Sequence, residues 1–93
     1  MKLKEIKIGQ IVVDRFGNEY IVKEVDRDSS PYNIMPIRIK CIKLLKSILV
    51  QRNDVLFCEV GQSFWIYKSK EVAKNDHTYI VDCITVEELK LKQ

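Results

Sequence analysis

The sequence has few of the residues from which catalytic and metal-binding sites are built. It contains one histidine, His77, and three cysteines, Cys41, Cys58 and Cys83. No two of these share the short spacing that paired zinc ligands show. His77 stands in a polar turn, where a histidine is usually a surface residue rather than an acid or base, and nothing obliges it to contact Cys83. We therefore predict that the chain is not an enzyme and uses no metal or cofactor.

Phosphate-binding loops and long apolar segments are also absent. The three glycines, at positions 9, 17 and 61, each have a turn to explain them and form no phosphate-binding motif. The first nine residues carry positive charge without the apolar stretch of a signal peptide, and no segment reaches transmembrane length. An odd number of cysteines, each inside an apolar run, fits reduced core thiols. These features predict a cytoplasmic protein.

Alanine is scarce, whereas β-branched aliphatic residues are abundant. Ala73 is the one alanine, against twelve isoleucines and ten valines. Side chains that branch at Cβ favour strands over helices. Because 46% of the 93 residues are hydrophobic, the chain can bury one core but not two. We predict one small, mostly β domain over residues 1–93.

The charge of the chain is nearly balanced. The net charge is +3, and twelve of the sixteen cations are lysines. The four arginines alone carry the planar guanidinium that suits phosphates and base edges. This balance permits a nucleic-acid partner without requiring one.

Turn signals divide the first half of the chain into short predicted strands. Residues 9–14 and 19–26 form a hairpin around Gly17 and Asn18, which both accept a positive φ. Residues 26–33 hold Ser-Ser-Pro without periodicity, so we expect an exposed loop whose Tyr32 is available to a partner. Strict alternation over residues 37–41 predicts a strand with one buried face and with Arg38 and Lys40 on the other.

The second half gives a less uniform pattern. Residues 42–52 fit either a helix or a continued strand, and we prefer the strand. Residues 55–60 and 63–68 predict a second hairpin around Gly61. We expect a helical turn at residues 70–73, a last strand at 78–84 and a short helix after the capping-box spacing of residues 85–88.

Several segments resemble the strands of a known class of small barrels. The run KIGQIVVD at residues 7–14, followed by FGNEYIV at 16–22, resembles the first two strands of SH3-like barrels. The runs PIRI at 36–39 and SFWIY at 63–67 are similar to strands of short barrel proteins carried by bacteriophages. The resemblance implies an SH3-like or related partly open β-barrel of five to six strands, with room for a short helix near 42–52 and at the C-terminus. The isoleucine and lysine usage also looks like that of an accessory protein of a phage or mobile element.

The aromatic run at residues 64–67 supplies the candidate binding residues. Alternation sends Phe64 and Ile66 to one face and Trp65 and Tyr67 to the other. If Phe64 and Ile66 are buried, Trp65 and Tyr67 stand outward together as a surface for a partner. The alternative is that residues 42–52 cover this hairpin on its other side.

A strip of cations is expected beside these aromatics. Arg38, Lys40 and Lys43 would form it, together with Lys46, and such a composition suits single-stranded nucleic acid or an acidic partner. The alternative is a solvated face whose lysines discourage aggregation at a sheet edge.

We therefore expect a non-catalytic binding module that occupies and modulates a host protein, such as part of a defence or replication machine. The predicted binding residues are Trp65, Tyr67, Arg38, Lys40, Tyr32 and Lys43. Three alternatives stay open: a barrel that binds nucleic acid, a protein that sequesters a small nucleotide-like ligand between protomers, and a small hydrolase that would depend on His77.

Overall fold

The fold is mostly β, with one short helix. The computed structural model describes residues 1–28, 30–51, 56–76 and 83–93. In chain order the elements are the 3-10 helix η1 (Leu3–Glu5), β1 (Ile11–Val13), β2 (Glu19–Val25), β3 (Ile37–Lys43), β4 (Leu49–Gln51), β5 (Leu56–Phe57), β6 (Ser63–Ile66), α1 (Lys70–Lys74), the 3-10 helix η2 (Val86–Glu88) and β7 (Lys90–Leu91). None of the described helices is long and apolar enough to span a membrane.

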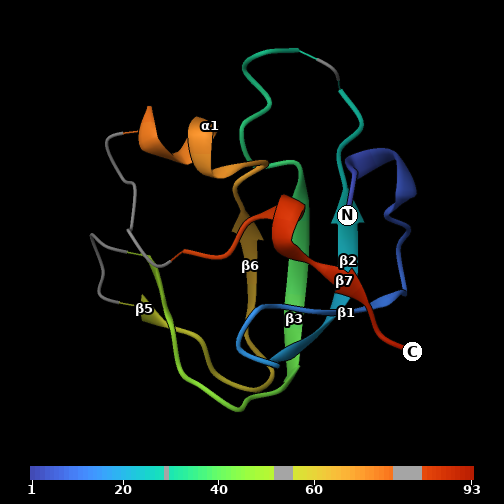
Figure 1. Ribbon diagram of the computed structural model, residues 1–93, viewed down its shortest axis with the longest axis vertical. Coiled ribbons are helices and arrows are strands. Elements are labelled where there is room, and N and C mark those ends of the chain that lie inside the picture. The colour runs from blue at the N-terminus through green and yellow to red at the C-terminus, as the bar shows by residue number, and fades with distance from the viewer. Residues whose placement is uncertain (29, 52–55, 77–82) are drawn as a thin grey trace.

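The main layer is an open antiparallel sheet of five strands in the order β6-β3-β2-β1-β7, and β4 and β5 form a separate two-stranded sheet. Within the described residues, the edge strands β6 and β7 do not pair, so the closure expected of a barrel is not found. The path of the chain from β6 to β7 explains why these two strands do not meet. It touches the β6 side through a parallel bridge of Tyr67 with Thr85 and then passes in front of β3 and β2 as η2, reaching β1 as β7 (Figure 1).

The predicted first hairpin is confirmed. β1 pairs antiparallel with β2, and Gly17 adopts a φ of 85° in the turn between them. The carboxylate of Asp14 closes this turn by accepting hydrogen bonds from the amides of Phe16, at 2.8 Å, and Asn18, at 3.0 Å. The turn is therefore built from a side chain that mimics a backbone acceptor and from a glycine that tolerates positive φ.

The predicted alternation in β3 is also confirmed. Ile37, Ile39 and Cys41 are fully buried, whereas Arg38 and Lys40 are partly exposed on the opposite face. β3 continues to Lys43, and residues 49–51 form β4. Of the predicted continued strand at residues 42–52, residues 42–43 and 49–51 are in strands, whereas residues 44–48 are in none. Residues 42–51 contain no helix.

The predicted second hairpin is wrong for the residues described. β5 pairs with β4, and β6 pairs with β3. At the start of β6 the Gly61 amide donates to the Cys41 carbonyl at 2.8 Å, and the Cys41 amide donates to the Gln62 carbonyl at 2.9 Å. The long strand β3 offers β6 four register pairs, whereas β5 has only two residues to pair with anything.

Some of the elements predicted for the C-terminal third of the chain are present in the structure. The helical turn is confirmed as α1, whose N-cap Ser69 accepts a hydrogen bond from the Val72 amide. The capping box of Thr85 and Glu88 is present and opens η2. Of the predicted strand at 78–84, residues 78–82 lie outside the described residues, and Cys83 and Ile84 are in no strand.

The core lies between the inner face of the sheet and the segments that cross it. Tyr20, Ile37 and Ile39 from the sheet share one buried cluster with Val86 and Leu89 from the C-terminal segment. The ring of Phe64 meets that of Tyr20 edge to face, with 5.9 Å between their centroids. The opposite face of β6, β3 and β2 carries the candidate binding residues.

Candidate binding surface

Three side chains form a row across the outer face of the sheet. Trp65 of β6 lies opposite Arg38 of β3, and Arg38 lies opposite Glu24 of β2. In the next row Lys40 lies between Ser63 and Ile21. We call the set formed by Trp65, Arg38, Glu24, Lys40 and Ile21 the outer patch.

Trp65 is the large aromatic of this patch. Its relative exposure is 39%, against 9% for Phe64 and 3% for Ile66 on the inner face. Of the two alternatives left open by the sequence, these three residues follow the one in which Phe64 and Ile66 are buried and Trp65 faces outward. A partly exposed indole on a flat sheet offers a large contact area at a small entropic cost, because the strand already fixes its backbone.

Arg38 is held in place beside Trp65. Its Nη2 donates to Oε1 of Glu24 at 2.8 Å, and the two side chains are 31% and 50% exposed. At this exposure the ion pair adds little stability. Its effect is to orient the guanidinium along the row and to place a carboxylate next to it, so this part of the patch carries both signs of charge.

Lys40 differs from Arg38 in its surroundings. Among the residues that the structure describes, no carboxylate forms an ion pair with it. Its cross-strand neighbours are the hydroxyl side chain of Ser63 and the aliphatic side chain of Ile21. The ammonium of Lys40 is thus the cation of the outer patch that can meet an acidic group of a partner.

Tyr67 is buried, and its predicted role as an exposed aromatic is wrong. It is 5% exposed and packs with Ala73 and Cys83, and its hydroxyl donates to Oδ2 of Asp76 at 2.7 Å. The physical reason is that β6 ends at Ile66, so strict alternation does not extend to residue 67. The segment of α1 and the bridge to Thr85 then enclose the ring.

Lys43 lies at the far end of β3 and belongs to a different cluster. Its Nζ is 3.6 Å from Glu19, which also accepts a hydrogen bond of 2.8 Å from Lys92. The hydrogen bond from Lys92 is the largest of the effects that lower the pKa of Glu19 below its ordinary value. Lys43 therefore helps to neutralise a carboxylate rather than extending the outer patch.

Tyr32 is exposed, as predicted, but stands apart on the loop between β2 and β3. It is 90% exposed, and this loop projects beyond the end of the sheet (Figure 1). The side chain of Asn33 bridges the loop by donating to the carbonyls of Asp26, at 3.2 Å, and Asp28, at 2.7 Å. The structure thus brings Trp65, Arg38 and Lys40 together and leaves Tyr32 and Lys43 outside the patch.

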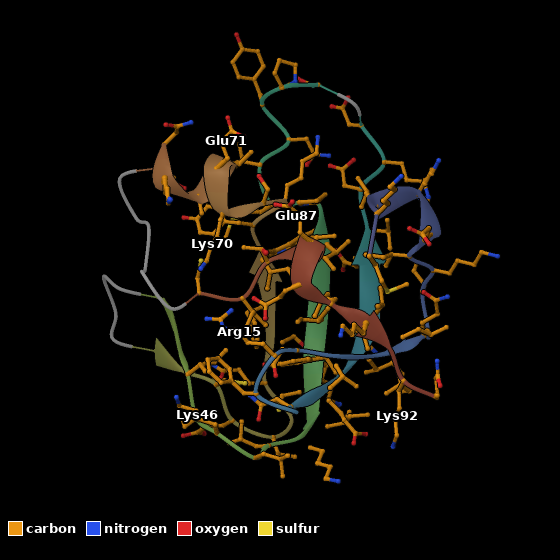
Figure 2. All side chains as sticks on the ribbon, in the orientation of Figure 1. Arg15, Lys46, Lys70, Glu71, Glu87 and Lys92 are labelled. Carbon is orange, nitrogen blue, oxygen red and sulfur yellow. The ribbon has the colours of Figure 1, made fainter. Side chains whose placement is uncertain are left out.

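Lys46, the last member of the predicted strip, lies with Arg15 on the side of the molecule that carries β4 and β5, whereas Lys92 is on the opposite side (Figure 2). Both cations approach the ring of Phe16, with Lys46 Nζ and Arg15 Cζ each 4.5 Å from its centroid. Arg15 also pairs with Glu88. This cluster fastens the first hairpin to the C-terminal segment, so the predicted continuous strip does not form.

Glu24 is a member of the outer patch that the sequence pattern missed. Alternation through Tyr20 and Val22 would turn Glu24 toward the core. A register shift between Val22 and Glu24 adds one residue to β2 and reverses the face. The alternation of apolar and polar residues along a strand does not reveal where such a β-bulge lies.

Within the described part of the chain, no group of three or more histidine, cysteine, aspartate or glutamate side chains could hold a metal ion. The chemistry available is that of an indole face, a paired guanidinium, an ammonium and an aliphatic side chain. No family model, curated protein or solved structure matches the chain.

Proposed function

We propose that this protein is a non-catalytic binding module that holds a partner protein on the outer patch. The observation that supports this most is the 39% exposure of Trp65 in a sheet whose other large aromatics of the same region, Phe64 and Tyr67, are buried. Tryptophan and arginine are the residues that most often dominate the energy of protein interfaces. The outer patch places one of each side by side.

The pairing of Arg38 with Glu24 favours protein over nucleic acid. A carboxylate 2.8 Å from the guanidinium repels a phosphate that approaches the same group. Among the described residues, Lys40 is then the one cation of the outer patch without an ion pair, whereas nucleic-acid sites neutralise several phosphates at once. A partner with an apolar pocket for the indole and an acidic group near Lys40 fits this face.

The kind of partner that we propose follows from the resemblance to SH3-like barrels and to short barrel proteins carried by bacteriophages. The first hairpin and the five-stranded antiparallel sheet support a relation to SH3-like barrels, and we propose a role as an accessory protein of a phage or mobile element that inhibits or modulates a host protein in the cytoplasm. Enzyme activity is not part of the proposal.

The test is partner capture with matched variants. The tagged wild-type chain, Trp65→Ala and the control Lys74→Ala would be exposed to the same host lysate, and each captured partner would then be purified for titration. We expect Trp65→Ala to weaken binding at least about tenfold, roughly 1.4 kcal/mol, in a chain that still folds. The exposed Lys74 lies on α1 and its replacement should leave the affinity unchanged.

Two outcomes would contradict the proposal. Equal affinity of Trp65→Ala and wild type would exclude the outer patch as the interface. Tight binding of single-stranded oligonucleotides, with an affinity that falls steeply and linearly on a logarithmic salt scale, would replace the protein partner by nucleic acid.

A further inference from the structure

The outer face of the five-stranded sheet carries apolar side chains that are not enclosed. Trp65 is 39% exposed, and Ile21 and its β1 neighbour Ile11 are half-buried. These three belong to neither of the two core clusters of the described residues. The inner face is different, because η2 passes over it and Val86 of η2 shares the main core cluster with Ile39 of β3 (Figure 1). In the described part of the chain, the sheet is therefore covered on one face only.

The dimensions of the molecule fit this one-sided cover. The chain measures 30 × 30 × 18 Å, and the strands β2, β3 and β6 run across its broad face, which Figure 1 views down the shortest axis. A face of 30 by 30 Å offers at most about 900 Å². A standard interface buries about 800 Å² on each partner, so the outer face is large enough to seat a second copy of the chain.

The charges of the outer face are separated by strand. At its paired positions, β3 turns only cations outward, namely Arg38, Lys40 and Lys43. On β2, Glu24 lies opposite Arg38, and Glu19 lies opposite Lys43. Lys23, which the bulge adds to β2, has no opposite residue in this register. At the paired positions, a cationic strand thus lies beside a strand that carries carboxylates.

We propose that two copies of the chain associate through their outer faces, about a two-fold axis that runs along the strands between β2 and β3. This axis places β3 of each copy over β2 of the other, so Arg38 meets Glu24 of the second copy and Lys43 meets its Glu19. A two-fold axis across the strands would instead place β3 over β3 and bring like charges together. The charge pattern therefore selects the axis along the strands.

The same axis encloses the apolar side chains. In the strand order β6-β3-β2-β1-β7, it exchanges β6 with β1, so Trp65 comes to lie over β1 of the second copy, beside Ile11. Lys40 meets Ile21 of the second copy, where its methylene groups can pack while the ammonium stays in water. The dimer then holds Trp65 until a partner protein displaces it. This last step rests on the proposed function, whereas the dimer itself does not.

Sedimentation equilibrium of the purified full chain, without any partner, measures the dimer. We expect a monomer–dimer equilibrium with a dissociation constant in the micromolar range. Arg38→Glu and Glu24→Arg alone each oppose like charges across the axis and should each weaken the dimer at least about tenfold. An equimolar mixture of the two variants should restore it, because the copy with two guanidinium groups then meets the copy with two carboxylates.

The matched controls change charge in the same way outside the outer face. Lys74→Glu and Glu71→Arg alter exposed residues of α1 and should dimerise like the wild type. Trp65 supplies a second measurement, since it is the one tryptophan of the chain. Its fluorescence emission should move to longer wavelength on dilution, with the same midpoint as the sedimentation curve.

Four results would overturn the proposal: a wild type that stays monomeric up to millimolar concentration, single variants that dimerise like the wild type, a mixture that stays monomeric, or a dimer whose dissociation leaves the Trp65 emission unchanged. Circular dichroism checks that each variant folds. If one single variant does not, the double variant Glu24→Arg, Arg38→Glu replaces the mixture and should dimerise like the wild type. A monomeric chain would remove the dimer only, because the capture experiment with Trp65→Ala decides the proposed function separately.

Discussion

Replacement of Asn18 by alanine removes the side chain that joins the first hairpin to the segment after β3. Asn18 is fully buried. Its Oδ1 accepts hydrogen bonds from the amides of Leu45, at 2.7 Å, and Lys46, at 2.9 Å. Its Nδ2 donates to Oδ2 of Asp14, at 3.0 Å, and to the Lys46 carbonyl, at 2.9 Å. Alanine leaves all four partners without this side chain.

The expected cost follows from these four contacts. A net hydrogen bond contributes about 0.5–1.5 kcal/mol, and a buried group left without a partner costs about 1–3 kcal/mol. Water can reach the backbone groups of Leu45 and Lys46 in part, because these bonds are only partly buried. We therefore expect Asn18→Ala to lower the free energy of unfolding by about 3–5 kcal/mol, a large share of the roughly 5–14 kcal/mol typical of a chain this long.

Urea unfolding followed by circular dichroism measures this loss, and Asn33→Ala is the matched control. Asn33 makes two hydrogen bonds through its Nδ2 to an exposed loop, where water can replace them. Asn33→Ala should therefore lower the free energy of unfolding by about 1 kcal/mol or less. The reasoning is refuted if Asn18→Ala costs less than about 1 kcal/mol or no more than the control. If Asn18→Ala does not fold, Tyr20→Phe, which removes the 2.7 Å hydrogen bond from the hydroxyl to Asp14, tests the same network with an expected loss of about 1.5–3 kcal/mol.

Three further predictions concern backbone conformation and titration. Gly17→Ala and Gly61→Ala should each cost about 1–3 kcal/mol in a thermal melt, because both positions have positive φ; the Cβ at 17 would come within 2.8 Å of Cδ1 of Leu45, but this exposed side chain can turn away, so a loss at 17 far larger than at 61 would contradict the reasoning. Glu19→Gln should lower stability near neutral pH. Since the folded pKa of Glu19 is lowered by its lysine partners, the difference from wild type should shrink as pH falls below the ordinary value of 4.5, and a difference independent of pH would contradict the assignment. Because burial raises the pKa of Cys58 to about 12, wild-type stability should fall as pH rises above the ordinary value of 9.0, and Cys58→Ala should flatten this decline in urea titrations; an unchanged slope would oppose it.

Much of the fold could be predicted because the responsible interactions are local. The hairpin of β1 and β2 follows from Gly17 and Asn18 between two apolar runs, and the two faces of β3 follow from its alternation. The Ser69 cap and the capping box of residues 85–88 are likewise encoded within three or four residues. Sterics and short-range hydrogen bonds decide such features, and both can be read along the chain.

The candidate site could be predicted only in part. Trp65, Arg38 and Lys40 share a face because each lies within a regular stretch of strand. Glu24 was missed because the bulge in β2 shifts its face, and a bulge depends on the pairing of two strands rather than on one sequence. Lys43 and Lys46 were expected beside the aromatics, but β3 ends at Lys43, and Lys46 turns toward Phe16.

The sequence by itself determined that the chain forms short β-strands, where its turns fall and which face of β3 is apolar, because steric branching, alternation and turn residues act between near neighbours. Only the tertiary structure decided that β6 pairs with β3 rather than β5 and that Tyr67 is enclosed by α1 and Thr85. Each of these depends on which distant segments share one core, and burial area and backbone pairing are properties of the packed chain rather than of any local pattern.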